Sequence, residues 1–362
     1  MSNLDEIFYK MERNDDLDFS PIPCLENQTE YQKVFSFENL YKSAIKCLRG
    51  VRWKASIQNV EYKLLSIVTQ LKNDLDNKTF KSNGFREFSI TERGKTRRIL
   101  SVDIKERIVQ KCLCDYCLVP KLIPSFIYDN PSCVKGKGLS FALKRVKEHL
   151  HKFSLQHGNN GYIVLFDVKS YFDSINKGIL LKKVRPRLDP ELFEIYSYFV
   201  NNFPDDIGIG LGSQISEISA LFYLSSLDHR MKDKERFKYY ARYMDDGYCI
   251  VETKEEAKRV VEILNEELTR VKLHLHPRKT VIQPLNKEFV YLKRKFTLRE
   301  DKTLLISPHK STVLRYKRKR KKLVKKGVEQ EKIEIVDTCF KAYLKEFNSY
   351  VPNKTRTCDI NR

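Results

Sequence analysis

The sequence predicts a mixed α+β fold, and three observations support this prediction. Two β-prone runs, residues 237–242 and 247–251, flank a short acidic break and are typical of a β-hairpin. A continuous apolar run over 162–166 is typical of a buried strand. Amphipathic helical patterns occupy 36–48 and 255–272. A local hairpin and a buried strand, together with helices of this length, are typical of an α+β protein.

The same patterns predict the helices and strands that precede residue 162 in the sequence. Ser36 is suited to cap the first helix, and a second helix is expected over 57–74, with Leu65 and Val68 among its inward residues. Residues 88–100 predict two strands around a basic turn at Gly94.

Further helices are expected over 103–118 and 141–150. Near the C-terminus, residues 293–326 hold fifteen Lys or Arg and two acids. A basic helix that ends at Gly327 and a last helix over 331–350 are predicted there.

Bulk composition points to a polyanionic partner. The chain has 362 residues, enough for one large domain or a few subdomains, and 41% of them are hydrophobic. Lys and Arg total 68 against 47 Asp and Glu, a net charge of +21. Such an excess favours nucleic acid, because neutralising phosphates releases counterions. A merely basic soluble protein is the alternative.

Targeting and cysteine content predict a cytoplasmic protein with no membrane partner. No signal peptide pattern and no apolar run of transmembrane length is present in the sequence. Nine cysteines without a secretion signal indicate reduced thiols. Cys112, Cys114 and Cys117 cluster, and a helix that buries thiols is favoured over a zinc site because no matching second pair follows.

Three carboxylates carry the candidate chemistry. Asp245 and Asp246 lie at the tip of the predicted hairpin, and Asp167 ends the predicted buried strand. Adjacent carboxylates repel one another unless a cation lies between them. Two divalent ions about 4 Å apart would form a phosphoryl-transfer site. The alternative is a hairpin turn with solvated aspartates.

These residues carry a resemblance to a known family. Tyr243-Met244-Asp245-Asp246, preceded by Phe166-Asp167 and Asp173, resembles the palm of a reverse transcriptase, and over about 35–300 the chain resembles the bacterial enzymes. The resemblance implies a right-hand polymerase fold with fingers, a palm made of an antiparallel sheet backed by helices, and a helical thumb. The implied parts are a loosely packed N-terminal arm at 1–34, fingers at 35–150, the palm with the catalytic site at 151–300, and a basic helical thumb with a tail at 301–362.

The resemblance also implies how the cations are held. Asp167, Val168, Asp245 and Asp246 stand at the positions that bind two Mg²⁺ ions, with Mn²⁺ as an alternative. Lys279 stands where a lysine protonates the leaving pyrophosphate. The implied catalytic residues are therefore these three aspartates and Lys279.

Further site residues follow from the family's other motifs. The implied nucleotide-binding residues are Lys95 and Arg97 on the basic hairpin, Phe172 under the sugar, and Gly212 and Gln214 in a glycine-rich segment. The implied nucleic-acid contacts are Lys135, Lys137, Ser216, Tyr243, Lys317, Arg318 and Arg320.

The segment 208–217 bears on the subfamily. With Leu211 before Gly212, it resembles the enzymes of diversity-generating retroelements, although Glu217 departs from their pattern. The expected activity is extension of a DNA or RNA primer on an RNA template with dNTPs. The expected partners are a structured non-coding RNA and a small basic accessory protein. A phage-defence reverse transcriptase, with templated or template-independent synthesis, and a catalytically silent RNA-binding module are the alternatives.

Overall fold

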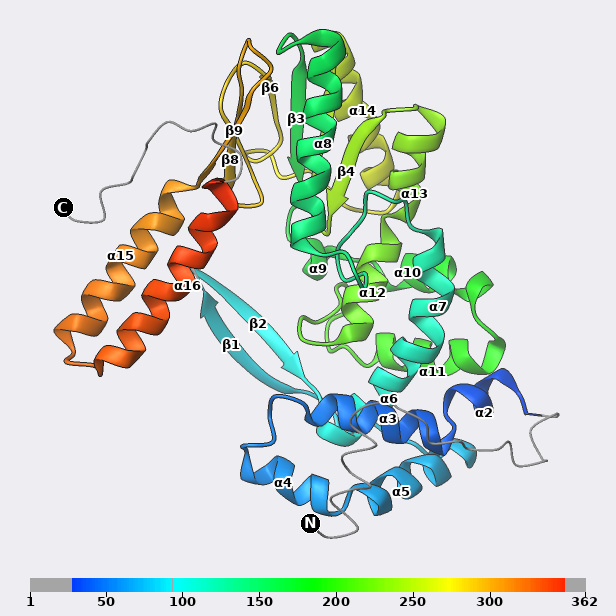
Figure 1. Cartoon of the computed structure of the whole chain (residues 1–362). Coiled ribbons are helices and arrows are strands. Elements are labelled where there is room, and N and C mark those ends of the chain that lie inside the picture. The colour runs from blue at the N-terminus through cyan, green and yellow to red at the C-terminus, as the bar shows by residue number, and fades with distance from the viewer. Residues whose placement is uncertain (1–27, 93, 349–362) are drawn as a thin grey trace, which may run out of the picture. The chain divides into compact units, whose positions relative to one another are not determined.

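The computed structural model describes residues 28–92 and 94–348 (Figure 1). The chain divides into two compact units, Met1–Lys81 and Ser82–Arg362. Most of the predicted arm, residues 1–27, and the tail beyond residue 348 lie outside the described part. The predicted division into arm, fingers, palm and thumb stays a prediction. Within the described residues, no helix is both long enough and apolar enough to cross a membrane.

The first unit is helical. Its described helices are α2 (Glu30–Val34), α3 (Phe37–Leu48), α4 (Ala55–Tyr62) and α5 (Leu64–Asp76). Ser36 caps α3 as predicted, because its hydroxyl accepts the backbone N–H of Asn39.

Two expectations about this unit are wrong. The end of the predicted loose arm is helix α2, in which Tyr31 and Val34 are buried. The single helix expected over 57–74 is broken at Lys63, and Leu65 points to solvent with 62% exposure.

The second unit begins with an antiparallel hairpin of β1 (Arg86–Glu92) and β2 (Lys95–Ser101). The helices that follow are α6 (Ile104–Leu113), the π-helical turn η2 (Cys114–Leu118), α7 (Val119–Leu122), the 3₁₀ turn η3 (Ile123–Ser125) and α8 (Leu139–His157). The helix predicted over 103–118 therefore loosens into a π turn, and the helix predicted over 141–150 is longer than expected. Asp103 caps α6 by accepting the backbone N–H of Glu106.

A four-stranded antiparallel sheet carries the motifs singled out above. Its strand order is β4 (Tyr239–Tyr243), β5 (Asp246–Val251), β3 (Tyr162–Asp167) and β6 (Val281–Pro284). Helix α8 crosses one face and α14 (Lys254–Arg270) the other (Figure 1). The predicted antiparallel sheet backed by helices, and with it the α+β fold class, is confirmed.

Helices between β3 and β4 complete this half of the unit. They are α9 (Tyr171–Ser174), α10 (Lys177–Val184), η4 (Arg185–Arg187), α11 (Pro190–Asn201), α12 (Gln214–Tyr223), α13 (Ser225–His229) and the π turn η5 (Arg230–Lys234). Most of α12 is buried, so the glycine-rich segment before it leads directly into the core.

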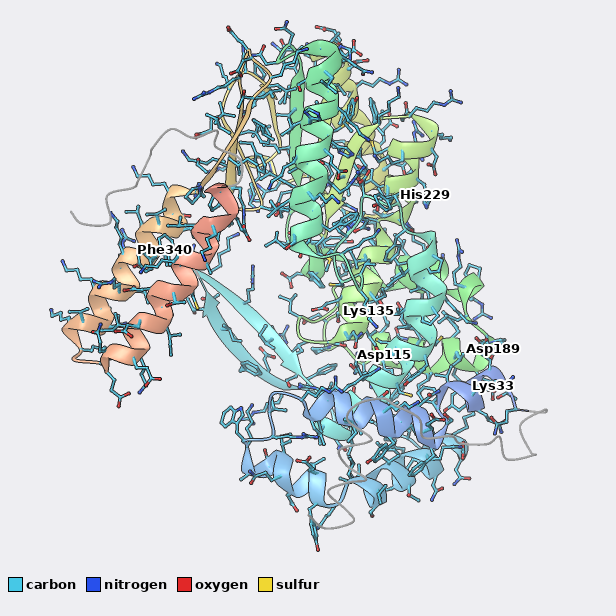
Figure 2. All side chains as sticks on the ribbon, in the orientation of Figure 1. Lys33, Asp115, Lys135, Asp189, His229 and Phe340 are labelled. Atoms are coloured by element: carbon cyan, nitrogen blue, oxygen red, sulfur yellow. The ribbon has the colours of Figure 1, made fainter. Side chains whose placement is uncertain are left out.

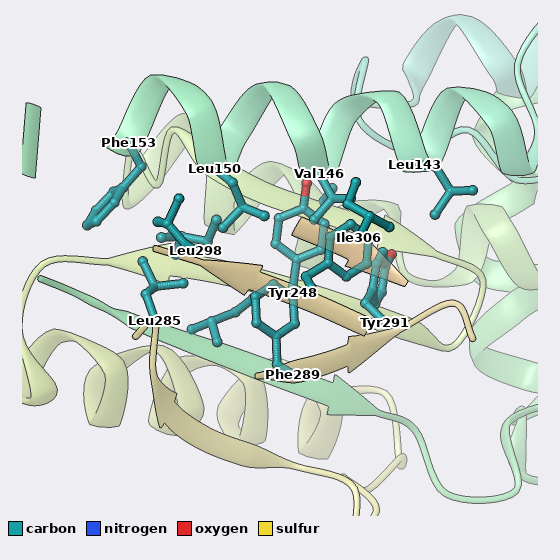
Figure 3. Packing of buried hydrophobic residues seen from close by; sticks show 14 of the residues in the cluster. Leu143, Val146, Leu150, Phe153, Tyr248, Leu285, Phe289, Tyr291, Leu298 and Ile306 are labelled. Carbon is teal, nitrogen blue, oxygen red and sulfur yellow. The ribbon is translucent and has the colours of Figure 1, made fainter. Parts of the chain in front are cut away.

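A second, three-stranded antiparallel sheet follows, made of β7 (Phe289–Tyr291), β8 (Arg294–Leu298) and β9 (Leu304–Pro308). Strand β9 continues this sheet past the palm–thumb boundary predicted at 300/301. Figure 3 shows the main core, in which side chains of α8 meet those of β5, β7, β8 and β9.

The chain ends in a pair of helices, α15 (Lys310–Lys325) and α16 (Gln330–Asn348). Tyr316 on α15 stacks on Phe340 of α16 with ring centroids 3.8 Å apart. Figure 2 labels Phe340 on this pair of helices. The predicted basic helix and its stop at Gly327, where φ is 62°, are confirmed.

Candidate active site

The hairpin of β4 and β5 presents two aspartates at its turn. Tyr243 pairs with Asp246 across the hairpin, so the turn consists of Met244 and Asp245. Met244 lies in the left-handed region with φ of 61°, which is strained for a residue with a long side chain. The acidic hairpin tip expected from the sequence is therefore present, with Asp245 in the turn and Asp246 at the start of β5.

Asp167 faces this turn from the neighbouring strand. At the end of β3 it pairs directly with Asp246, and the backbone N–H of Val168 donates to the carbonyl of Asp245 over 3.1 Å. Close packing fixes the register, since a Cβ at Gly247 would lie 2.2 Å from the ring of Phe166. Only glycine fits beneath that ring, so the two strands are held at a set offset.

Lys279 reaches the same point from a third segment. Its ammonium lies 2.5 Å from a carboxylate oxygen of Asp167. Backbone bonds hold this segment along the end of β3: His276 N–H donates to the Asp167 carbonyl over 2.7 Å, and Lys169 N–H donates to the His274 carbonyl over 3.0 Å. The lysine predicted from the sequence is therefore placed beside the aspartates.

The electrostatics of the aspartates reflect their crowding. Burial, more than any other effect, raises the pKa of Asp245, and the charge of Asp167 adds to this. Burial also raises the pKa of Asp246 to about 7, helped by a side-chain hydrogen bond with Asp167 and the charge of Asp245. The two aspartates at the hairpin tip are therefore partly buried, in contrast to the alternative of fully solvated side chains.

An open cleft of about 820 Å³ lies above these carboxylates. Its floor includes Asp167, Asp245, Asp246 and Lys279. Basic side chains line its walls, and they are Lys95, Arg97, Lys293, Arg294 and Arg315. Negative charge at the floor and positive charge on the walls suit a ligand that carries phosphates and brings cations with it.

The hairpin of β1 and β2 divides its basic residues between its two faces. Lys95 and Arg97 line the cleft, whereas Arg98 pairs with Glu87 at 2.8 Å and with Asp205 at 2.5 Å. Alternation along a strand explains this difference, because neighbouring side chains point to opposite faces. Of these, the residues predicted to bind nucleotide are the ones in the cleft.

A family model described as "Reverse transcriptase (RNA-dependent DNA polymerase)" matches residues 46–319 of the chain. The chain belongs to the reverse transcriptase family. The resemblance noted in the sequence is thus confirmed at the level of the family. None of the curated proteins matches the chain.

Solved telomerase structures are similar to this reverse transcriptase at low identity. Telomerase from Candida albicans, in complex with a TWJ fragment of telomeric RNA, shares 13% identity with a TM-score of 0.44, over 68% of this chain and 49% of that chain. Telomerase from Candida tropicalis shares 13% identity with a TM-score of 0.49 in a form truncated from its C-terminal domain, and covers 67% of this chain and 60% of that chain. Another apo structure of that telomerase shares 14% identity with a TM-score of 0.47, over 70% and 54%. The reverse transcriptase therefore spans between about half and three fifths of these telomerase chains.

The glycine-rich segment lies against the base of the hairpin, outside the cleft. The Leu211 carbonyl accepts the N–H of Leu100 over 3.0 Å, and a Cβ at Gly212 would lie 3.1 Å from Ile99. The segment is also bonded to the first acidic motif, because the backbone N–H of Ile209 donates to the Phe172 carbonyl over 2.9 Å. It therefore joins two of the predicted motifs through backbone bonds.

The residues predicted in this region to bind nucleotide or nucleic acid lie away from the cleft. Gln214 donates to Asp115 over 3.4 Å, and the ring of Phe172 packs edge-on against Tyr171. Ser216 is buried in α12 at 1% exposure, and its hydroxyl has no hydrogen-bond partner. Gly212 is exposed. None of these four residues lines the cleft as described.

The residues predicted to contact nucleic acid differ in their exposure and in the contacts that they already make within the fold. Tyr243 lines the cleft, and Lys135 is exposed (Figure 2). Lys137 donates to the Tyr128 carbonyl over 2.8 Å and lies 4.5 Å above the ring of that residue. Its ammonium therefore stabilises the loop before α8.

On α15, Lys317 and Arg318 are exposed, whereas Arg320 pairs with Asp337 of α16 at 3.0 Å. Arg320 therefore connects the two last helices, and Lys317 and Arg318 remain on the exposed basic face.

Sequence reasoning missed four basic residues at or behind the cleft. Arg294, the first residue of β8, lines the cleft. Lys293 lies in the two-residue turn between β7 and β8, and Arg315 lies one turn into α15. Arg242 is completely buried behind the hairpin turn. The sequence did contain a signal for Arg242, because an arginine in the apolar run before Tyr243 predicts a buried charge that is paired.

The cysteine cluster is structural. Cys112, Cys114 and Cys117 are buried in α6 and η2, and burial raises the pKa of Cys114 well above its usual value. The predicted helix that buries thiols is confirmed, and the zinc alternative finds no support in the structure. Among the described residues, no group of three or more His, Cys, Asp or Glu side chains is arranged so that it could hold a metal ion by itself.

The three carboxylates at the cleft nevertheless fit divalent cations in their chemistry. Asp167, Asp245 and Asp246 offer hard oxygen donors. Burial, with a smaller contribution from neighbouring carboxylates, raises the pKa of Asp245 and of Asp246. Mg²⁺ is usually bound by one or two carboxylates together with substrate phosphates, so a closed protein cage is not needed. Val168 contributes its buried backbone at the same place.

Proposed function

We propose that this reverse transcriptase is an RNA-directed DNA polymerase that extends a DNA or RNA primer on an RNA template. The observation that carries the proposal is the convergence of Asp167, Asp245, Asp246 and Lys279 on the floor of a cleft with basic walls. Asp167 and Asp246 lie on adjacent strands, and Asp245 lies in the turn before β5. The three carboxylates share one site, which fits nucleotidyl transfer better than binding alone.

The carboxylates bind the metal ions of the reaction. In the proposed mechanism, Asp167, Asp245 and Asp246 hold two divalent cations, Mg²⁺ in the first instance, with the Val168 carbonyl as a further ligand. When bound, these ions activate the primer hydroxyl and neutralise charge on the phosphates. The protein's part is to fix the positions of these oxygens in advance, which the paired strands and the Gly247–Phe166 contact support.

Basic side chains are proposed to bind the triphosphate of the incoming nucleotide and to protonate the leaving pyrophosphate. Lys95 and Arg97 line the cleft wall, where they would hold the phosphates of an incoming dNTP. The ammonium of Lys279, which contacts Asp167, would donate a proton to the leaving pyrophosphate. Its flexible stem and 42% side-chain exposure suit a group that moves between these two partners.

The glycine-rich segment is proposed to support the template and the nucleotide. Phe172 would lie under the sugar and select deoxynucleotides, while Gly212, Gln214 and Ser216 would order the templating base. Support comes from the backbone bonds that join this segment to Phe172 and to β2. Because their side chains lie outside the cleft, these roles require a shift of the segment when substrates bind.

The primer–template duplex is proposed to lie against the C-terminal helices. Lys317 and Arg318 on the exposed face of α15, with Arg315 and Lys293 at the cleft, supply positive charge for its phosphates. Lys135 and Tyr243 are proposed to contact the template, whereas Lys137 and Arg320 act by holding their own segments in place.

For the biological role, we propose service to a diversity-generating retroelement, with a structured non-coding RNA and a small basic accessory protein as partners. The residues at 208–217, with Leu211 before Gly212, carry this part of the proposal. A phage-defence enzyme would share the same catalytic residues, so only its products separate the two roles.

The activity is tested by primer extension with purified protein, an RNA template, dNTPs and Mg²⁺. The wild type should extend the primer, and Asp245→Asn should not. The role is tested by sequencing the RNA that co-purifies with the protein and the cDNA made from it. One structured RNA copied with errors concentrated at adenines supports the retroelement role. Untemplated or repetitive DNA supports the defence role instead.

A further inference from the structure

A charged network lies buried directly behind the hairpin turn. Arg242 is 0% exposed, and its guanidinium donates to both carboxylate oxygens of Asp228, over 2.8 and 2.6 Å. The same group donates to the Met244 carbonyl over 2.7 Å and to the Leu221 carbonyl over 3.1 Å. Four of the five N–H groups of this buried cation therefore donate to an acceptor.

Asp228 is matched as well. It is 0% exposed and also accepts the hydroxyl of Tyr240 over 2.8 Å and the amide of Asn130 over 3.2 Å. Burying an ion pair requires such complete hydrogen bonding, because both charges lose their water. An apolar pair of similar volume would serve the packing equally well. The network therefore calls for a role beyond packing.

The bond to Met244 supplies such a role. Met244 is the first turn residue, its φ of 61° is unfavourable, and it is followed directly by Asp245 and Asp246. A strained backbone persists only where its surroundings hold it. The guanidinium of Arg242, anchored by Asp228, holds the carbonyl of this strained residue from the buried side.

The network also connects the turn to another motif. Leu221, whose carbonyl accepts from Arg242, lies on α12, and the neighbouring Ala220 carbonyl accepts the buried hydroxyl of Tyr171. Tyr171 immediately precedes Phe172, so two acidic motifs are fixed to one helix. Arg242 is the point at which the turn joins this arrangement.

We propose that Arg242, anchored by Asp228, is a positioning residue that holds the Met244 carbonyl and thereby presets the carboxylates of Asp245 and Asp246 for divalent cations. This inference rests on the proposed function of the site, since it concerns how that site takes up metal. Groups that orient metal ligands from behind typically change metal affinity by about 10- to 100-fold when they are removed.

The test compares two variants of the same network. Arg242→Lys keeps a positive charge but loses the planar fork, so one ammonium cannot reach Asp228 and Met244 together. Tyr240→Phe removes a different hydrogen bond to Asp228 and leaves the Met244 contact in place. Both variants disturb the buried pair, and only the first disturbs the turn.

The main readout is Mn²⁺ binding without nucleic acid or dNTP, measured by the loss of the free Mn²⁺ EPR signal. Thermal unfolding is measured in parallel. We expect Arg242→Lys to bind Mn²⁺ at least about tenfold more weakly than the wild type, and Tyr240→Phe to stay within about twofold. Equal Mn²⁺ binding by Arg242→Lys and the wild type overturns the proposal, as does an equal loss in both variants.

If Arg242→Lys shows no cooperative unfolding transition, Arg242→Gln combined with Asp228→Asn replaces it. That double variant removes both buried charges together, and the same tenfold loss of Mn²⁺ binding is expected; unchanged binding overturns the proposal. Because the EPR readout needs no polymerisation, it also separates two failures. A wild type that binds Mn²⁺ but makes no DNA contradicts the proposed function and leaves the positioning test intact.

Discussion

Asp167 and Asp246 lie directly opposite one another on the antiparallel strands β3 and β5. Residues opposed in this way have Cα atoms only about 5 Å apart. Two carboxylates at that spacing, partly shielded from water, repel one another whenever both are ionised. Holding both carboxylates ionised at this spacing therefore lowers the free energy of unfolding, and the first prediction tests this effect.

In buffer with a chelator, Asp246→Asn should stabilise the protein, and more so as the pH rises. Burial, hydrogen bonding to Asp167 and the charge of Asp245 raise the pKa of Asp246 to about 7. A carboxyl with a raised pKa in the folded state lowers stability as the pH rises from about 4, the unfolded value, towards 7. Asparagine cannot ionise and escapes this loss.

Thermal unfolding at pH 5 and at pH 8 checks this prediction. The melting temperature of Asp246→Asn should exceed that of the wild type by about 2 °C or more at pH 8, and by less at pH 5. The same difference at both pH values would contradict the prediction. The variant should also lose polymerase activity, in the usual trade between stability and function.

Lys279→Arg and Lys279→Met should separate ion pairing from proton donation. Arginine keeps the charge beside Asp167 but does not release its proton near neutral pH, so it cannot act as an acid. We expect both variants to lose kcat by roughly a hundredfold, the typical contribution of a general acid. Single-turnover kinetics measure this loss, and a fully active Lys279→Arg would mean that charge alone is required.

Arg97→Ala and Arg98→Ala form a matched pair on one strand. Arg97 lines the cleft, whereas Arg98 pairs with Glu87 and Asp205 on the other face of the hairpin. Arg97→Ala should raise KM for dNTP by about tenfold or more, because a charge-assisted contact with the triphosphate is lost. Arg98→Ala should leave that KM within about twofold. Steady-state kinetics measure KM for dNTP in both variants. An equal increase in both would contradict a specific role of Arg97 in binding the triphosphate.

Arg318→Ala should reduce the salt dependence of primer–template binding. Arg318 is exposed on α15, whereas the neighbouring Arg320 is already paired with Asp337. Each phosphate contact adds about 0.9 to the slope of log K against log salt on B-DNA and about 0.7 on a single strand. The slope should fall by about one such step for Arg318→Ala and by less for Arg320→Ala. Fluorescence anisotropy titrations at several salt concentrations measure it, and unchanged slopes for both would place the duplex elsewhere.

Local patterns were sufficient to predict the centre of the site. The strand over 162–166 and the hairpin around Met244 each depend on neighbouring residues, and the structure has both. The proximity of Asp167 and Asp246 could be predicted from the sequence, because the end of a strand and the tip of a neighbouring hairpin lie at the same edge of a sheet.

The rest depended on packing between distant segments, which local patterns do not report. Lys293 and Arg315 enter the cleft only because the second sheet and α15 lie beside it. Arg242 acts through Asp228, fourteen residues earlier, and through a carbonyl on α12. In the first unit, the break between α4 and α5 at Lys63 interrupts a pattern that reads as one helix.

The central claim, RNA-templated DNA synthesis at the three aspartates, is tested most directly by exchanging the template. Two RNA templates that share a primer site but differ downstream are each copied by the wild type and by Asp245→Asn, with Mg²⁺ and all four dNTPs. The products are then sequenced. The account predicts DNA complementary to whichever template was added, and no product from Asp245→Asn. DNA whose sequence ignores the template, or synthesis that survives Asp245→Asn, would contradict it.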